Sequence, residues 1–123
     1  MGTLRTLTTA QADDLRKALQ GAERRSGLRF GVFLGEPAGS RRHFAERLHA
    51  ALGEESADAV VVFVDPGGRA LEIVTGRNAR RRLSDGACRL TALSMATAFS
   101  AGDLVGGLLY GIAALGEQAT TRR

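Results

Sequence analysis

The sequence has 123 residues, which is enough for one domain with a buried core and too few for two independent ones. Hydrophobic residues make up 44% and charged residues 24%, which excludes a disordered, collagen-like or coiled-coil chain. The single cysteine, Cys88, excludes an intrachain disulfide and a zinc site built from several thiolates. We expect one domain over residues 1–123, with frayed termini at 1–7 and 117–123.

Two segments bear on the location of the protein. The longest apolar segment, Leu104–Leu115, is shorter than the roughly 18 to 20 residues that cross a bilayer, so we expect no membrane insertion. The segment Met1–Ala12 is rich in threonine and lacks the apolar stretch of a secretory signal. Together these patterns predict a cytoplasmic protein.

The first 50 residues predict a helix, a strand and a second helix. Four apolar residues recur at helical spacing after a threonine cap at Thr8 or Thr9: Leu15, Ala18, Leu19 and Ala22. This helix should end near Gly27, and the alternating pattern of Leu28–Leu34 predicts a strand. A loop over 35–40 precedes a helix that Ser40 caps and that carries apolar residues every four positions: Phe44, Leu48 and Leu52.

The middle of the chain predicts a buried strand and a hairpin. Ala59–Val64 is a continuous run rich in β-branched residues, which is typical of a strand covered on both faces. Turn residues at 65–68 follow, and alternation resumes over Leu71–Thr75. A helical connection makes the first strand pair parallel, whereas the hairpin pair is antiparallel. The expected sheet is therefore mixed.

The last third predicts helices. A short helix contains Ala79 and Leu83, and Ser84 or Asp85 caps a longer one whose apolar residues are Leu90, Leu93, Ala96 and Phe99. Gly102 ends it, and Asp103 caps a last, nearly all-apolar helix that we expect to be buried. Helices before, between and after a small mixed sheet predict an α/β fold with a three-layer α/β/α sandwich.

The order of several short segments resembles the TPM domain family, which occurs in thylakoid-lumen and bacterial proteins. The segments are Phe44-Ala45-Glu46-Arg47-Leu48, Val60 to Val64, Leu71 to Gly76, Leu83-Ser84-Asp85, and Phe99 to Asp103 leading into Gly106-Gly107-Leu108. The chain is most similar to an actinobacterial branch described as a domain of unknown function. The resemblance implies the same sandwich, divalent-metal binding at loop carboxylates and an acid-phosphatase-like activity.

Hard cations such as calcium or magnesium need several converging oxygen ligands. The positions that match the family pattern are Asp58, Asp85 and Asp103, and they form the first candidate metal site. Asp65 lies at the opposite end of the central strand from Asp58, roughly 20 Å away, so these two cannot share an ion. A second candidate pairs Glu36 with Asp65 at the carboxyl ends of the parallel strands. Helix caps and turn residues are the structural alternative for every one of these aspartates.

Arginine clusters are the candidate sites for an anionic partner, because the guanidinium group binds phosphate and carboxylate. The denser cluster is Arg77, Arg80, Arg81 and Arg82, and the second is Arg41, Arg42 and Arg47. No aromatic residue lies near the denser cluster in sequence, and Phe44, beside the second, is assigned to a core-facing element, so nucleic acid is not the expected partner. A solvated helix face is the alternative interpretation.

The sequence thus favours a small cytoplasmic bacterial binding module that recognises an acidic protein or an anionic ligand and has no catalytic residue of its own. The rival hypothesis is a metal-dependent phosphatase-like hydrolase that uses Asp58, Asp85 and Asp103 with calcium or magnesium. His43 and His49 are six residues apart on one helix and cannot chelate one ion as an i, i+4 pair does.

Overall fold

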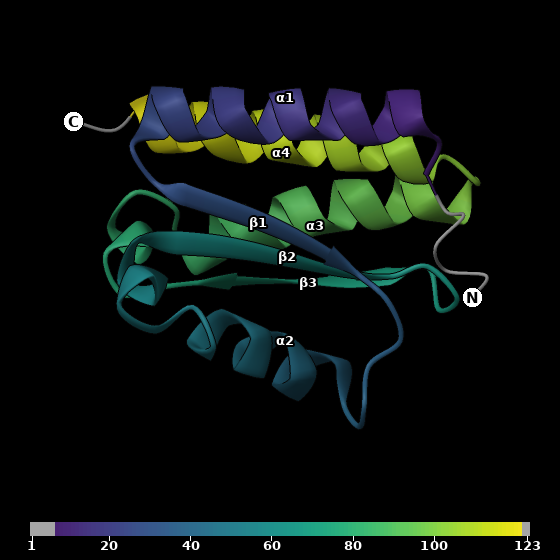
Figure 1. Ribbon diagram of the computed structural model, residues 1–123, viewed down its shortest axis with the longest axis horizontal. Coiled ribbons are helices and arrows are strands. Elements are labelled where there is room, and N and C mark those ends of the chain that lie inside the picture. Colours follow the sequence, from purple (N-terminus) through teal and green to yellow (C-terminus); the bar gives the residue numbers. More distant parts are fainter. Residues whose placement is uncertain (1–6, 122–123) are drawn as a thin grey trace.

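The structure, a computed structural model, describes residues 7–121. Helices and strands follow one another along this part of the chain, as Figure 1 shows. The α-helices and strands are α1 (Thr9–Ser26), β1 (Arg29–Leu34), α2 (Arg41–Ala50), β2 (Ala59–Asp65), β3 (Ala70–Thr75), α3 (Asp85–Ser100) and α4 (Leu104–Thr121). Two short 3-10 helices, η2 (Gly53–Asp58) and η3 (Ala79–Arg81), precede β2 and follow β3.

The three strands form one mixed sheet in the order β1-β2-β3. The middle strand, β2, pairs in parallel with β1 and antiparallel with β3. Every residue of β2 is buried, as expected for a strand that is covered on both faces. The predicted small mixed sheet, with its parallel pair and its hairpin, is therefore confirmed.

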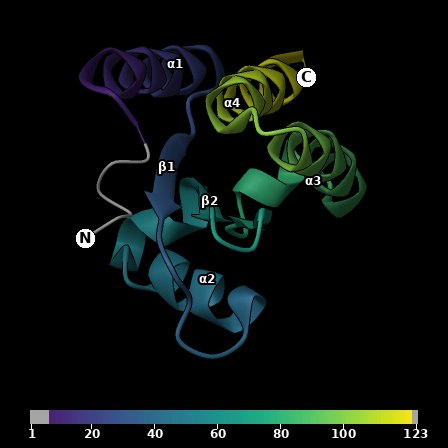
Figure 2. The same cartoon turned by 90° about the vertical axis from the view of Figure 1, so that its right-hand side faces the viewer.

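Helices lie on both sides of the sheet, and each side has its own hydrophobic core. α1, α3 and α4 lie on one side and α2 lies on the other (Figure 1, and Figure 2 from the side). The larger core joins those three helices to alternate residues of β2, namely Val60, Val62 and Val64. In the smaller core the ring of Phe63 meets the ring of Phe44 edge-on, with centroids 5.1 Å apart. The alternation of side chains along β2 thus divides its residues between two cores.

Local sequence sets where the helices begin. In each of four helices a side-chain oxygen accepts a hydrogen bond from the backbone N–H three residues later, and the acceptors are Thr8, Ser40, Ser84 and Asp103. Thr8 forms a full capping box, because its own N–H donates to the side chain of Gln11. These bonds satisfy N–H groups that lack a partner within the helix. The predicted caps are present.

α3 buries a set of residues that differs in part from the apolar residues that mark it as a helix in the sequence. Leu90 and Leu93 belong to the apolar pattern that predicts this helix, but they are 70% and 65% exposed. The buried side chains are Cys88, Thr91, Met95 and Phe99. Both sets repeat at helical spacing, and burial of the second set is possible because the Thr91 hydroxyl accepts a hydrogen bond from the Gln118 amide on α4. Leu90 and Leu93 therefore identify the helix but not its buried face.

The end of α4 also differs from expectation. Residues 117–121 form its last turn instead of a frayed end, because Ala119 is fully buried and its carbonyl accepts a hydrogen bond from Arg82. Leu7, at the other expected frayed end, packs against the larger core. Tyr110 is 54% exposed because the helix buries only the side that faces α1 and α3. Positions 1–6 and 122–123 lie outside the described residues.

Within residues 7–121, no helix combines the length and the apolar character that are needed to span a membrane. The longest apolar segment belongs to α4, and its buried side chains belong to the larger core.

Gly76 provides a test of the packing at the end of β3. A Cβ atom at this position would lie 1.9 Å from the carbonyl oxygen of Ser56 and 2.6 Å from that of Ala57. Backbone atoms move less readily than side chains, so we expect Gly76→Ala to lower the free energy of unfolding by about 1–3 kcal/mol in urea denaturation. The control is Gly35→Ala, where no atom lies within 4 Å, and it should change stability by less than about 0.5 kcal/mol. Equal stability of the two variants would contradict the close approach.

Candidate functional site

The three carboxylates of the first candidate metal site lie in three different parts of the chain and have different surroundings. Asp58 accepts a 2.9 Å hydrogen bond from the side-chain amide of Asn78. Asp85 is the first residue of α3, and Asp103 caps α4. Among the described residues, no group of three or more His, Cys, Asp and Glu side chains could hold a metal ion. The structure therefore does not bring Asp58, Asp85 and Asp103 together.

The second candidate metal site depends on Asp65, which is nearly buried and already has two partners. One oxygen accepts from the N–H of Gly68 at 3.3 Å, and the other lies 3.4 Å from Nε of Arg41. These contacts are those of a turn residue paired with an arginine. Glu36 lies exposed in the loop after β1.

The four arginines of the denser predicted cluster have different roles. Arg82 donates to the carbonyl of Ser26 at 2.8 Å and to that of Ala119 at 3.3 Å, so it joins the carboxyl ends of α1 and α4. Arg80 donates to the carbonyl of Thr75 at 2.5 Å. Arg77 and Arg81 are exposed. Arg77 and Arg80 line one further cleft together, whereas Arg82 contacts the ends of two helices.

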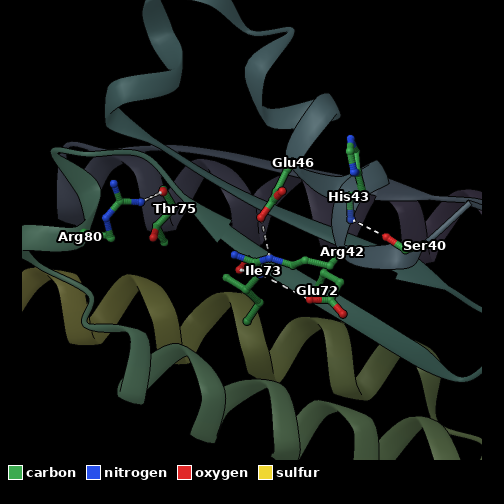
Figure 3. A network of polar contacts seen from close by, with 8 residues as sticks. All are labelled: Ser40, Arg42, His43, Glu46, Glu72, Ile73, Thr75 and Arg80. Carbon is green, nitrogen blue, oxygen red and sulfur yellow. Dashed lines mark hydrogen bonds and ion pairs between the residues drawn. The ribbon is translucent and has the colours of Figure 1, made fainter.

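Two arginine side chains contact the outer edge of β3, which is the edge that faces away from β2. Nη1 of Arg42, on α2, donates to the carbonyl of Ile73 at 2.9 Å, and Nη1 of Arg80 donates to that of Thr75 (Figure 3). Ile73 and Thr75 are two residues apart, so both carbonyls point from the same edge of the strand. No strand within residues 7–121 pairs with this edge. The edge is open, and arginine side chains from outside the sheet contact it.

A cleft with a volume of about 310 Å³ runs over this edge. α2 contributes Arg42 to it, β3 contributes residues 71–73, and α3 contributes one wall, formed by Asp85, Cys88, Arg89 and Ala92. Arg42 is held there by Glu46 at 3.1 Å and by Glu72 at 3.4 Å. The cleft is therefore polar and lies between the helices on the two sides of the sheet.

An apolar recess of about 520 Å³ adjoins the cleft and shares Leu71, Arg89 and Ala92 with it. Its other lining residues are Arg69, Ala70, Leu90, Leu93 and Ala96. The exposed leucines of α3 therefore lie beside the open edge. We call the cleft and the recess together the β3 groove. Three arginines, Arg42, Arg69 and Arg89, and two carboxylates, Glu72 and Asp85, line it, which leaves an excess of positive charge.

The thiol of Cys88 faces the cleft from α3 but is largely buried. The pKa of this thiol is raised to about 11, mainly by burial and also by the nearby carboxylate of Asp85, while Arg42 acts in the opposite direction. A thiol with this pKa is protonated at neutral pH, and the thiolate is the nucleophilic form. Cys88 is therefore part of the packing of α3.

Comparison with known proteins assigns the family. The family model described as "Domain of unknown function (DUF5130)" matches residues 5–116. The chain belongs to this family. The expected membership of the TPM domain family is wrong, because the model that matches is that of DUF5130. The order of the short matching segments was insufficient to tell the two families apart. Each segment matches only the pattern of a buried strand or a helix end, which many α/β proteins share.

Two relatives from Mycobacterium tuberculosis are similar to this chain. They are "Uncharacterized protein MT2543" of strain CDC 1551 and "Uncharacterized protein Rv2468c" of strain H37Rv, each 33% identical over 103 residues. The match covers 82% of this chain and 60% of each relative, so the chain spans about three-fifths of their length.

Two solved structures share the fold. The BA42 protein from Bizionia argentinensis matches with a TM-score of 0.83 and 19% identity, over 93% of this chain and 81% of that protein. The N-terminal domain of cg2496 from Corynebacterium glutamicum matches with a TM-score of 0.77 and 12% identity, over 96% and 78%. At these identities the likeness concerns the fold alone.

Sequence reasoning missed the β3 groove. It used Leu90 and Leu93 only as part of a helical pattern, and it did not connect Arg42 with β3, which is about thirty residues away in the chain. One signal was available, because Leu90 follows Arg89 and Leu93 precedes Ser94, on a helix that has a second stripe of small and apolar residues. A helix that contacts a single core buries only one such stripe, so the other stripe stays exposed.

The thiol of Cys88 should react slowly at neutral pH. With a pKa of about 11, only about one thiol in a thousand is ionised at pH 8, so we expect Ellman's reagent to react far more slowly with the folded protein than with the protein in urea. The rate for the folded protein should rise as the pH increases from 9 toward 11. Rapid reaction of the folded protein at pH 7.5 would contradict the burial of the thiol.

Arg82 should be structural, in contrast to its neighbour Arg81. Because Arg82 bonds the last carbonyls of two helices, we expect Arg82→Ala to lower the free energy of unfolding by about 1–3 kcal/mol. Arg81→Ala removes the same charge from an exposed position and should leave the stability within about 0.5 kcal/mol of the parent. Thermal and urea unfolding of both variants measure the difference, and equal losses would refute this role.

Proposed function

We propose that this chain is an interaction module that binds an acidic partner in the β3 groove. The observation that carries the proposal is the junction of two surfaces: exposed Leu90 and Leu93 lie next to a cleft that contains arginines from α2 and α3. A surface of this kind can bury apolar side chains and pair with carboxylates at the same time. Either feature alone would be ordinary on a protein surface.

The apolar part of the groove supplies affinity. Full burial of a leucine side chain is worth about 1.5–3 kcal/mol, and Leu90 and Leu93 both retain most of their exposed surface in the free protein. The recess of about 520 Å³ that they line has room for one or two side chains of a partner. We therefore assign the main gain in binding energy to this recess.

The charged part supplies selectivity. Arg89 is exposed and belongs to both parts of the groove, so a carboxylate bound there would lie beside an apolar side chain bound in the recess. Arg69 extends the positive charge toward the hairpin, although it also donates to the carbonyl of Ser100 at 3.2 Å. An acidic partner with interspersed apolar residues is the chemistry that this arrangement favours.

The three-layer arrangement expected from the sequence gives the groove its two walls in this proposal. α2 belongs to one helical layer and brings Arg42, while α3 belongs to the other and brings Arg89 and the two leucines. The open edge of the sheet forms the floor between them. A partner would thus contact both helical layers and the sheet.

A direct binding measurement tests this proposal. The probe is a fluorescein-labelled nonapeptide in which glutamate alternates with leucine or valine, and fluorescence anisotropy reports its affinity. We expect Arg89→Glu to weaken binding about tenfold or more, since it removes an attraction and adds a repulsion. Leu93→Glu should weaken it similarly, and higher salt should weaken binding to the parent protein.

The matched control is Lys17→Glu, which makes the same change of charge on the exposed face of α1. We expect its affinity to stay within about twofold of the parent value. An equal loss with Lys17→Glu would mean that net charge, and not the groove, attracts the peptide. No binding of the peptide to the parent protein would overturn the proposal.

A further inference from the structure

We propose that the partner binds as an extended segment that adds a fourth strand to the sheet at the outer edge of β3. This inference rests on the proposed function, because it concerns how a partner is held in the same groove. It specifies the conformation of that partner and the side-chain pattern that the groove selects.

The pairing of β3 with β2 determines which backbone groups point outward. Gly76 donates its N–H to the carbonyl of Ala59 on β2. Every second residue counted back from Gly76 along β3 therefore directs its backbone N–H and carbonyl groups inward, toward β2. The residues between them direct their backbone groups to the outer edge, and these residues are Leu71, Ile73 and Thr75. Two of these carbonyls, at Ile73 and Thr75, are the ones that accept from arginine. The outer edge thus has the regular hydrogen-bonding pattern of a strand that lacks a neighbour.

The arginines stand where the N–H donors of a neighbouring strand would be. Figure 3 shows Arg42 beside Ile73 and Arg80 beside Thr75, each with a guanidinium nitrogen directed at the carbonyl. Side chains can be displaced from such positions, whereas a covering strand of the same chain could not. Arg42 keeps Glu46 and Glu72 as partners when it leaves the carbonyl, so an incoming backbone can replace it at small cost.

The two sides of the sheet would give the added strand two different environments. Leu71 and Ile73 belong to the core shared with α3, whereas Val74 belongs to the core under α2. A new strand continues both faces of the sheet, so its alternate side chains would point toward α3 and toward α2. Those on the α3 side would enter the recess of Leu90 and Leu93, and those on the α2 side would lie near Arg42. The groove therefore selects a segment in which apolar and acidic residues alternate.

A peptide accounts for the groove better than a single-stranded nucleic acid. Nucleic-acid grooves combine positive charge with aromatic side chains on which bases stack. The exposed large aromatic residues in the described part of the chain are Phe33 and Tyr110, and neither lines the groove. The open hydrogen-bonding edge of β3 matches a polypeptide backbone.

Backbone methylation of the peptide tests strand addition without altering the protein. Two versions of the alternating nonapeptide are compared with the unmodified one: in one the apolar residues are N-methylated, and in the other the glutamates are. Successive residues of a strand direct their N–H groups to opposite edges, so methylation of the set that faces β3 removes its donors and blocks close approach. We expect one version to lose at least about tenfold in affinity and the other to stay within about twofold of the unmodified peptide.

Amide hydrogen exchange provides a second readout. Addition of the unmodified peptide should slow the exchange of the N–H groups of Leu71 and Ile73, which point to the outer edge. The N–H of Val74 points to β2 and is the internal control, so its exchange should change much less. Protection of Leu71 and Ile73 together with the one-sided effect of methylation would establish the fourth strand.

The possible failures can be told apart. If both methylated peptides bind like the unmodified one and Arg89→Glu still weakens binding, strand addition is wrong and the proposed function stands. If the unmodified peptide does not bind, the proposed function itself fails. If a single-stranded oligonucleotide of the same charge displaces the peptide at lower concentration than unlabelled peptide does, the groove is a nucleic-acid site and the inference is overturned.

Discussion

The burial of β2 on both faces is the constraint on which the rest of the structure depends. Its residues alternate between two cores, so neither face of the sheet can be left to solvent. α1, α3 and α4 cover Val60, Val62 and Val64, and α2 covers Phe63. Burial of each such side chain is worth about 1.5–3 kcal/mol, which far exceeds the contribution of a surface ion pair. The placement of helices on both sides follows from this single strand.

A sheet of three strands has two edge strands, and this chain satisfies much of their polarity with side chains from helices. The N–H of Phe30 on β1 donates to the carboxylate of Glu23 on α1 at 2.9 Å. At the other edge, carbonyls of β3 accept from Arg42 and Arg80. Such contacts limit uncontrolled pairing between molecules while leaving the backbone groups within reach of a specific partner. β3 differs from β1 because a groove with exposed leucines lies beside it.

The arginines show why residue type alone does not identify a binding surface. Arg82 donates hydrogen bonds to carbonyls at the ends of two helices, Arg41 pairs with a buried turn aspartate, and Arg89 lines the groove. The fold is common to proteins that are only 12 to 19% identical to this chain, so the fold carries no information about these individual roles. They follow from the contacts that each side chain makes in this structure.

Several features were predictable because their causes are local. The caps at Ser40, Ser84 and Asp103 involve an N–H only three residues away, and the hairpin between β2 and β3 follows from the turn chemistry of four consecutive residues. The burial of β2 was evident from its unbroken run of apolar residues. The candidate site was not predictable in the same way, since Asp58 accepts a hydrogen bond from Asn78, twenty residues away, and only Asp103 among the proposed metal ligands caps a helix.

The sequence by itself therefore determined the order of the elements, the starts of the helices and the strand at the centre of the sheet, because hydrogen bonds and side-chain alternation within a few residues set them. Tertiary structure alone decided which stripe of α3 is buried, and it brought Arg42 to a carbonyl thirty-one positions away. It also separated Asp58, Asp85 and Asp103. These outcomes depend on how elements distant in the chain pack against one another, and the spacing of residues within one element carries no information about that packing.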